Sequence, residues 1–250
     1  MKVVQKIVIV GATSAMAEHC ARLWVAESPQ NLILLGRDQA RTERVAQDLR
    51  VRSSQSNITV NTTEFMDPVR IREWVDHVCA EGVPDIVLIA HGSLPDQKEC
   101  QQDLVLNQEV LQLNGISPIL FAEAFAGHME KSNKGKLAII GSVAGDRGRK
   151  SNYVYGSAKG LVTRYAQGLQ HRLAGSNVKI MLIKPGPTDT PMTAEIKSKG
   201  VKLADVKTVA QSIVKGIETS VPVIYAPKKW GLIMMVIRHL PRFIFNKMDI

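Results

Sequence analysis

The sequence predicts an α/β fold: a single Rossmann-type, doubly wound domain with a seven-stranded parallel sheet and helices on both faces. Short apolar runs alternate with longer amphipathic stretches along the chain. The runs are rich in leucine and β-branched residues and mostly lack polar alternation, which is typical of strands covered on both faces. Strands that alternate with helices form parallel sheets with right-handed crossovers. Ligands of such sheets bind at the carboxyl ends of the strands.

The apolar runs and amphipathic stretches give the following order of elements. Strands are predicted at Lys6–Val10, Leu32–Leu35, Ile58–Val60, Ile86–Ala90, Leu137–Ile140, Val178–Ile183 and Val223–Tyr225. Helices are predicted at Ala15–Glu27, Gln39–Arg50, Pro68–Ala80, Leu104–Lys131, Tyr153–Ala174 and Asp205–Thr219. A chain of 250 residues can form one sizeable core. We therefore expect a dinucleotide-binding and catalytic domain over residues 1–227 and an apolar, basic helical tail over residues 228–250.

The composition is that of an ordinary globular protein, with 45% hydrophobic and 22% charged residues. The three cysteines, Cys20, Cys79 and Cys100, are odd in number and lack metal-like spacing. This favours a reducing compartment and no metal site. The first ten residues run into a strand rather than a leader-like segment, and the longest apolar stretch is far too short to cross a bilayer. We expect a cytoplasmic protein.

The formal net charge of +9 is compatible with an anionic ligand, an anionic membrane surface or nucleic acid. The basic residues are dispersed and no recognised nucleic-acid motif is present. We therefore expect no nucleic-acid partner.

The first predicted strand ends in a turn that opens a helix, where backbone N–H groups can bind a pyrophosphate. Gly11 permits the tight turn, and Thr13, Ser14, Ala15 and Met16 follow it. These five residues are candidate cofactor-binding residues. Taken alone, the motif is equally compatible with an ordinary strand–helix turn.

The end of the second strand suggests which dinucleotide is bound. An acidic residue at this point selects a free ribose 2′-hydroxyl, but Gly36 occupies the position and Arg37 follows. A guanidinium suits a 2′-phosphate, so NADP(H) is favoured and NAD(H) remains possible. Asp38 keeps the NAD alternative open, and helix capping is the role that we favour for it.

Two further strand ends supply candidates. Asp67 precedes a helix and either contacts the adenine amine or caps that helix. Ala90 and Gly92 end the fourth strand, where Gly92 lets the cofactor approach closely. His91, between them, is interpreted as a polar loop residue rather than a catalyst.

Tyr155 and Lys159 lie four positions apart on a predicted helix and therefore share one face. An ammonium beside a phenol favours the phenolate, so Lys159 is expected to lower the pKa of Tyr155 and make it a proton donor or acceptor. An exposed tyrosine–lysine pair is the alternative for these two residues alone. Ser142 follows the fifth strand, and Asn114 sits within a predicted helix, where asparagine is unfavourable.

The sixth strand ends in a loop that is a candidate site for the carboxamide of a nicotinamide cofactor. Its candidate residues are Pro185, Gly186, Thr188 and Thr190.

Together, these motifs resemble those of the short-chain dehydrogenase/reductase family over about Lys6 to Pro227. The resemblance implies that Ser142 orients the substrate carbonyl and that Tyr155 is the general acid in reduction and the general base in oxidation. It implies that Lys159 lowers the tyrosine pKa and holds ribose, that Asn114 holds a water, and that Thr190 binds the carboxamide.

The resemblance further implies a homodimer or homotetramer. The chain departs from the family pattern at Ala15 and Ala17, where glycine is usual. It departs again at Ile89-Ala90-His91-Gly92, where an asparagine-rich motif is usual.

The C-terminal tail is apolar, aromatic and basic, and Pro241 should divide it into two short helices. Such a segment either lies on an anionic membrane, making the protein peripheral on the inner face, or packs over the pocket or a subunit interface. Its sequence is similar to the end of decaprenylphosphoryl-2-keto-erythro-pentose reductases, a group within the same family. That similarity implies a lipid-phosphate-linked keto-sugar substrate. Arg147, Arg149 and Lys150 would then either meet its phosphate or form a solvated loop.

The sequence thus predicts an NAD(P)H-dependent oxidoreductase that transfers hydride between nicotinamide and a carbonyl or alcohol. The substrate is a small molecule or a lipid-linked carbonyl compound. The alternative is a catalytically silent protein of the same fold that senses NADP.

Overall fold

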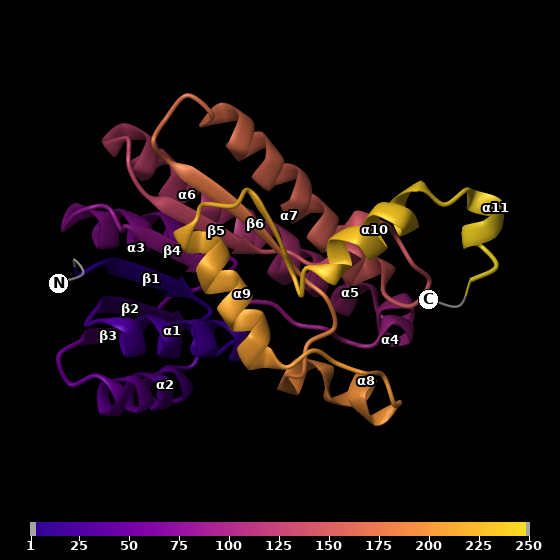
Figure 1. Cartoon of the computed structure of the whole chain (residues 1–250), viewed down its shortest axis with the longest axis horizontal. Coiled ribbons are helices and arrows are strands. Elements are labelled where there is room, and N and C mark those ends of the chain that lie inside the picture. Colours follow the sequence, from indigo (N-terminus) through magenta and orange to yellow (C-terminus); the bar gives the residue numbers. More distant parts are fainter. Residues whose placement is uncertain (1–3, 249–250) are drawn as a thin grey trace.

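The computed structural model describes residues 4–248, except for the side chain at position 196. The described strands form one seven-stranded, all-parallel sheet in the order β3-β2-β1-β4-β5-β6-β7 (Figure 1). This confirms the predicted fold class. The strands are β1 (Lys6–Val10), β2 (Asn31–Gly36), β3 (Asn57–Thr62), β4 (Ile86–Ile89), β5 (Lys136–Ile140), β6 (Lys179–Pro185) and β7 (Val223–Ala226).

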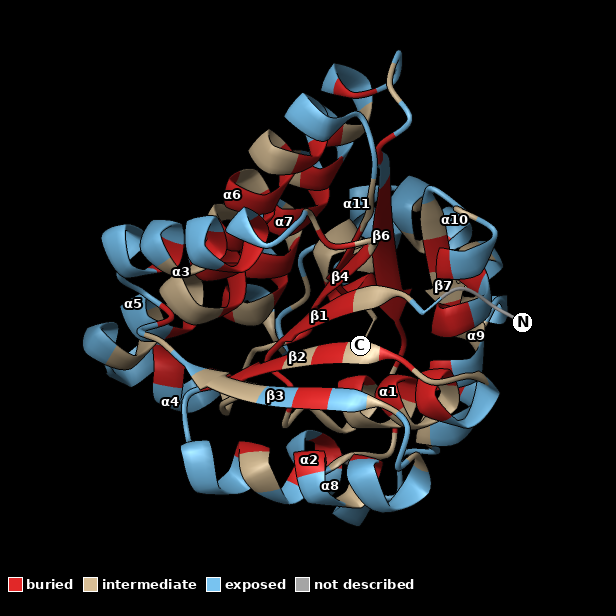
Figure 2. Ribbon diagram, turned by 90° about the vertical axis from the view of Figure 1, so that its left-hand side faces the viewer, coloured by how far each residue is buried: buried red, intermediate tan, exposed pale blue. Residues whose placement is uncertain are grey.

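Helices cover both faces of this sheet because successive strand residues point to opposite sides. In β1, Ile7 and Ile9 pack into one core with α1 (Ala15–Glu27), α2 (Gln39–Arg52) and α9 (Val206–Glu218). Val8 and Val10 pack into the other core, with α3 (Pro68–Ala80), α6 (Ser117–Ser132) and α7 (Tyr153–Arg172). All four β1 residues have no exposed surface, as the buried strands in Figure 2 illustrate. This two-sided burial explains the continuous apolar runs in the sequence.

The strand order reverses between β1 and β4, which are neighbours although they are not consecutive in sequence. The connections that leave their carboxyl ends run to opposite faces and open a crevice there. The turn after β1 and the loop after β4 therefore face each other, so the topology brings Gly11 to the loop that contains Gly92.

The helix predicted over Leu104–Lys131 is not a regular α-helix, and this prediction needs correction. It consists of α5 (Leu104–Leu111), a π-helical turn η1 (Gln112–Ile116) and α6. By length and composition, the run Leu104–Ser132 could cross a membrane, but 61% of its most apolar window is buried in the protein. The run packs against α3 and α7, so it is a core helix.

Four short elements were not predicted from the sequence. They are α4 (Gln97–Gln102), α8 (Ala194–Ser198) and the 3₁₀ turns η2 (Val143–Asp146) and η3 (Pro191–Thr193). Each is six residues or shorter, too short to show a helical period.

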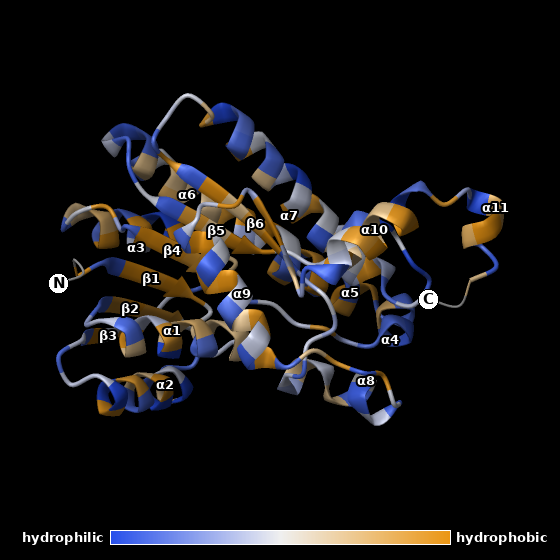
Figure 3. Cartoon of the chain, in the orientation of Figure 1, coloured by the Kyte–Doolittle hydropathy of each residue, from blue (hydrophilic) through white to orange (hydrophobic). Residues whose placement is uncertain are grey.

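The tail forms α10 (Lys229–His239) and α11 (Arg242–Phe245), and Pro241 separates them as predicted. Met234 is buried, and the Trp230 indole lies so close to Gly186 that no side chain would fit there. The outer side of the tail exposes large apolar side chains, visible as the hydrophobic parts of α10 and α11 in Figure 3. These exposed residues are Leu232, Met235, Val236, Phe243 and Ile244.

A buried ion pair joins β6 to the turn after β5. Lys184 Nζ donates to Asp146 Oδ1, and the two side chains are only 4% and 2% exposed. Tyr225 Oη donates to the other carboxylate oxygen at 2.9 Å, and this bond together with burial raises the pKa of Tyr225 to about 12. The cluster thereby ties η2 to the last two strands.

We expect Lys184→Met to lower the free energy of unfolding by roughly 3–5 kcal/mol, because it leaves the Asp146 carboxylate buried without its cation. Tyr225→Phe is the milder control and should cost about 1 kcal/mol. Urea unfolding measures both values. A loss below about 1 kcal/mol for Lys184→Met would contradict the assignment of this pair as a structural tie.

Candidate active site

The turn after β1 is built around a backbone conformation that favours glycine. Gly11 has φ +82°, and a Cβ there would lie 2.6 Å from the backbone nitrogen of His91. The backbone N–H groups of Gly11 and Ala12 both donate to the Leu35 carbonyl, at 2.9 and 3.0 Å. The chain then enters α1 after Ser14, whose side chain makes no capping hydrogen bond. The N-terminus of α1 is therefore presented to the crevice between β1 and β4.

Two adjoining cavities lie along the carboxyl edge of the sheet, and both are lined by Ser14, Met16, Ala90, Gly92 and Thr190. The first, here called the dinucleotide groove, also contains the remaining β1-turn and β2-end candidates: Gly11, Thr13, Ala15 and Arg37. The second, here called the catalytic pocket, contains the other candidates: Asn114, Ser142, Tyr155, Lys159, Pro185, Gly186 and Thr188. The structure thus brings together every candidate site residue except Asp67.

Asp67 lies outside both cavities and caps α3. Its Oδ1 accepts hydrogen bonds from the backbone N–H groups of Val69 and Arg70, at 2.8 and 3.2 Å. Of the two roles left open by the sequence, capping is the one observed. Contact with an adenine stays a prediction.

The end of β2 presents guanidinium groups to the dinucleotide groove. Arg37 and Arg41 both line it. Asp38 caps α2 by accepting from the Arg41 backbone N–H at 2.9 Å, which is the helix-capping role expected for it. Arg41 was missed in the sequence, although its position one turn after Arg37 at a helix start was a usable signal.

His91 lines both cavities as a neutral side chain. Its Nε2 lies 2.9 Å from Ser117 Oγ, and Ser117 donates its hydroxyl proton to the Phe65 carbonyl. His91 must therefore donate from Nε2 and keep Nδ1 as an acceptor. Burial, with help from Lys159 and Arg37, lowers the pKa of His91 to about 3. Nδ1 is buried and has no hydrogen-bond partner among the residues that the structure describes, as expected of an acceptor reserved for a bound group.

Asn114 lies in the π-turn η1, which explains its unfavourable position in the sequence. Its Nδ2 donates to the Val110 carbonyl at 3.0 Å, and its Oδ1 accepts from the Ser93 backbone N–H at 2.9 Å. A Cβ on Gly92 would be 2.5 Å from that oxygen. The asparagine thus connects the π-turn to the loop after β4 while its amide N–H stays bonded to the preceding helical turn.

Ser142 and Tyr155 are held together by close backbone packing between η2 and α7. A Cβ on Gly145 would lie 2.6 Å from the carbonyl carbon and oxygen of Lys159, so only glycine fits there. The Lys159 ammonium donates to the Ile140 carbonyl at 3.0 Å and lies 5.8 Å from the Tyr155 ring centre. All three side chains of the predicted constellation therefore converge on one pocket wall.

Burial governs the proton affinities of this constellation. It raises the pKa of Tyr155 to about 12, although the hydrogen bond with Ser142 lowers it. It lowers the pKa of Lys159 to about 8. Desolvation of the Tyr155 phenol therefore outweighs its hydrogen bond with Ser142, and the expectation that Lys159 lowers the tyrosine pKa stays a prediction.

The loop after β6 closes the far side of the catalytic pocket. Thr188 donates its hydroxyl proton to the Gly186 carbonyl at 2.9 Å. The Thr190 backbone N–H donates to Thr193 Oγ1 at 3.1 Å, which fixes the start of η3. Because Trp230 of the tail lies against Gly186, the tail supports this loop from behind.

The arginines that follow η2 have different surroundings. Arg147 Nη1 donates to the carbonyls of Ile237 and Leu240, and its guanidinium lies 3.7 Å from the Phe245 ring centre. Arg147 therefore anchors the tail, so neither the phosphate-binding nor the solvated-loop interpretation describes it. Arg149 and Asn152 line the catalytic pocket instead.

Gln97 is a positioning residue that the sequence did not reveal. Its Oε1 accepts from the Val154 backbone N–H at 3.0 Å and thereby caps the first turn of α7, the helix that carries Tyr155. A glutamine from a distant short helix gives no local capping signal in the sequence.

The cysteines take no part in the site. Cys20, Cys79 and Cys100 are free, buried and outside both cavities. Burial raises the pKa of the Cys79 thiol to about 11 and also raises that of Cys100. Within residues 4–248, no group of three or more His, Cys, Asp or Glu side chains is arranged to hold a metal ion.

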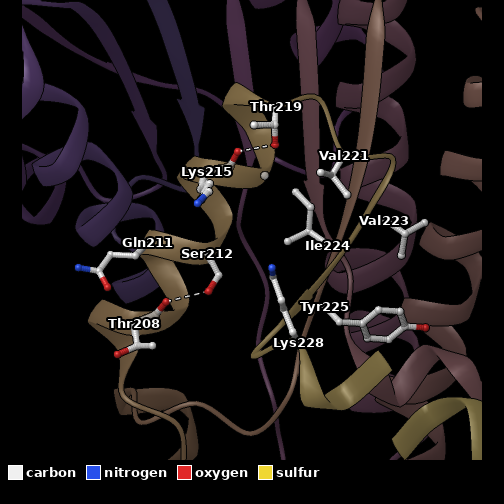
Figure 4. Close-up of a pocket in the computed structure, with 11 residues that line it drawn as sticks. Thr208, Gln211, Ser212, Lys215, Thr219, Val221, Val223, Ile224, Tyr225 and Lys228 are labelled. Atoms are coloured by element: carbon white, nitrogen blue, oxygen red, sulfur yellow. Dashed lines mark hydrogen bonds between the residues drawn. The ribbon is translucent and has the colours of Figure 1, made fainter. Parts of the chain in front are cut away.

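A separate hollow lies between α9 and β7, away from the candidate residues (Figure 4). Two of its hydroxyls bond carbonyls of their own helix: Ser212 donates to the Thr208 carbonyl at 3.1 Å and Thr219 to the Lys215 carbonyl at 2.8 Å. It contains no histidine or carboxylate. Its one phenol, that of Tyr225, already donates to the Asp146 carboxylate.

Comparison with known proteins gives one family. A family model described as short chain dehydrogenase matches residues 5–200. The chain is 26% identical over 246 residues to an uncharacterized oxidoreductase of Streptomyces coelicolor, covering 98% of this chain and 96% of that protein. It is 28% identical over 247 residues to an uncharacterized oxidoreductase of Mycobacterium tuberculosis, covering 97% of this chain and 96% of that protein.

Solved structures have the same fold. A short-chain dehydrogenase from Sphingobium yanoikuyae, in complex with NADPH, has a TM-score of 0.80 at 20% identity and covers 95% of this chain and 97% of that one. One from Burkholderia cenocepacia, in complex with NADP, has a TM-score of 0.82 at 13% identity and covers 99% and 98%. With a family model matched over most of its length, the chain belongs to the short-chain dehydrogenase family of oxidoreductases.

Proposed function

We propose that this protein is an NADP(H)-dependent reductase of a carbonyl compound, with Tyr155 as its proton donor. The observation that carries the proposal is the convergence of Ser142, Tyr155 and Lys159 in a pocket that adjoins the dinucleotide groove. The cradle at Gly11, the helix N-terminus beside it and the unpartnered Nδ1 of His91 all suit a dinucleotide.

Three side chains have separate roles in the proposed reduction. The nicotinamide, when bound, supplies the hydride. Ser142 is placed to donate a hydrogen bond to the carbonyl oxygen of the substrate. Tyr155 keeps its proton at neutral pH, since its pKa is about 12, and can give it to that oxygen as negative charge develops. The Lys159 ammonium stabilises the phenolate that remains and is placed to hold ribose hydroxyls.

For the binding residues, we propose that Thr13, Ser14, Ala15 and Met16 hold the pyrophosphate at the start of α1. Ala90 and Gly92 border the dinucleotide at the end of β4. The loop of Pro185, Gly186, Thr188 and Thr190 receives the carboxamide. Asn114 holds a water between Lys159 and solvent.

The finer identity of the substrate rests on resemblance. The keto-sugar on a polyprenyl phosphate stays a prediction, since the relatives reported above are named only as oxidoreductases. A homodimer or homotetramer and a cytoplasmic location also stay predictions. The competing hypothesis, a catalytically silent NADP sensor, would hold if the purified protein bound NADPH but reduced none of a broad panel of carbonyl compounds.

The tail remains a candidate membrane contact. Phe243 is 71% exposed and Leu232 66% exposed, and basic residues flank both. An exposed apolar face of this kind suits either an anionic lipid surface or a second subunit. Flotation with phosphatidylglycerol vesicles distinguishes the two, because only the lipid contact would carry the protein upward with the vesicles.

We expect Tyr155→Phe to lower kcat for carbonyl reduction at least about 100-fold, because the variant loses the proton donor. Its affinity for NADPH should change little. Tyr153→Phe is the matched control, since that phenol is 43% exposed and lines neither cavity. Steady-state kinetics and fluorescence titration of NADPH provide the two readouts. Full activity in Tyr155→Phe would remove the proposed mechanism.

We expect kcat/KM for reduction to fall as the pH rises through about 8. Burial lowers the pKa of Lys159 to about 8, so its ammonium is present below that pH and lost above it, whereas Tyr155 stays protonated on both sides. The pH profile from 6 to 10 measures the effect. Lys159→Met should have a low rate without this decline, and an unbroken wild-type profile across pH 7–9 would contradict the assignment.

We expect Arg37→Ala to raise KM for NADPH about 10-fold while KM for NADH changes less than about 2-fold. The reason is the loss of a charge-assisted hydrogen bond to the 2′-phosphate. Arg44→Ala, on the α2 helix that follows Arg37 but outside the groove, is the control. Equal effects of Arg37→Ala on both cofactors would argue against the phosphate contact.

A further inference from the structure

Arg149 is a cationic side chain on the wall of the catalytic pocket with no partner for its charge. It lines the same cavity as Ser142 and Tyr155. Its Nε is buried and has no hydrogen-bond partner. Within residues 4–248, no ion pair or side-chain hydrogen bond of Arg149 is formed, and burial alone lowers its pKa. A half-buried guanidinium with an unsatisfied donor is costly to keep in a folded protein.

Arg147, two residues earlier, shows that an arginine in this loop can find hydrogen-bond acceptors within the protein. Arg147 donates to two tail carbonyls and stacks on Phe245. Arg149 has no such arrangement and faces the pocket instead. Its donors are therefore left for something that enters the pocket.

Asn152 supplies a second unsatisfied group on the same wall. Its Oδ1 is buried and has no hydrogen-bond partner in the described part of the chain, and its backbone N–H donates to the Arg149 carbonyl at 3.2 Å. This turn keeps the two residues together at the entrance to α7. A guanidinium donor beside an amide acceptor suits a ligand that carries an anionic oxygen and a hydroxyl.

The charge of the pocket favours the same kind of ligand. Of the described residues that line the catalytic pocket, only Arg149 and Lys159 carry a formal charge, and none is acidic. The pocket is therefore positive. Arg149 does not line the dinucleotide groove, so its site is separate from the arginines at the end of β2.

We infer that Arg149 is a specificity-determining residue that binds a phosphate or carboxylate on the carbonyl substrate, with Asn152 accepting a neighbouring hydroxyl. This inference rests on the proposed function and narrows it to anionic, hydroxylated carbonyl substrates. The anion can belong to a soluble phosphate ester or to a lipid phosphate, and the two share the same contact with the guanidinium.

The test compares neutral ketoses with their phosphate esters on the NADP⁺-loaded protein, where binding is measured without turnover. The two probe pairs are dihydroxyacetone with dihydroxyacetone phosphate and ribulose with ribulose 5-phosphate, which place the phosphate at two distances from the carbonyl. We expect calorimetry to give at least about 10-fold tighter binding of a phosphate ester than of its neutral partner.

Arg149→Met should reduce that ratio to near one and leave the neutral ketose unchanged, and Arg149→Lys should restore part of it. Arg164→Met is the control, because Arg164 is exposed on α7, the helix that follows Arg149, and its one side-chain hydrogen bond within residues 4–248 is to Gln167 at 3.0 Å. This control should keep the wild-type ratio. A wild-type ratio near one for both pairs, or a ratio retained in Arg149→Met, overturns the inference.

Two further measurements separate the alternatives. Competition by farnesyl phosphate in micelles that exceeds competition by inorganic phosphate supports a lipid-linked anion, and equal competition supports a soluble one. In either case the competition must vanish in Arg149→Met, and its persistence overturns the inference. Because binding is measured without hydride transfer, full activity in Tyr155→Phe would defeat the proposed mechanism and leave the phosphate ratio intact.

Discussion

The site depends on the backbone contact between η2 and α7. Gly145 packs directly on the carbonyl of Lys159, while the side chain of the same lysine reaches the last carbonyl of β5. Main chain and side chain thus fix one helix to one strand end from two directions. This contact fixes the relative position of the Ser142 and Tyr155 hydroxyls, because Ser142 follows the strand and Tyr155 lies on the helix.

Most of the fold could be predicted from the sequence because the buried strands are predominantly apolar. The run Lys6–Val10 was located to the residue, since both of its faces meet helices and no polar residue interrupts it. The candidate site residues could also be named from the sequence, because a tyrosine and a lysine one helical turn apart carry a recognisable chemistry, and the structure brings them into one cavity. The surroundings of these side chains could not be predicted from the sequence. The pKa of Tyr155 depends on how deeply the phenol is buried, and burial is a property of the assembled layers.

Other features escaped sequence reasoning for a physical reason: they join distant segments. The cap on α7 comes from Gln97, 57 positions before the N–H that it accepts. The contact of Arg147 with the tail spans 90 residues to Ile237. In both cases one side chain contacts distant backbone groups, and such contacts produce no periodic pattern in the sequence. The tail therefore helps to hold the pocket in place, since Trp230 packs against the loop after β6 and Arg147 joins the tail to the loop after η2.

At the π-turn of Gln112–Ile116, the conformation that positions Asn114 differs from the α-helix that would be most stable locally. Removing one residue there would let α5 and α6 merge into a regular helix with a better hydrogen-bond ladder. The same deletion would rotate everything on one side of it by about 100° relative to the other, because an α-helix has about 3.6 residues per turn. Asn114 would swing away from Ser93, and the loop after β4 would lose its anchor. The shorter, locally more stable helix would therefore no longer position Asn114. Selection for thermal stability alone would favour loss of the π-turn.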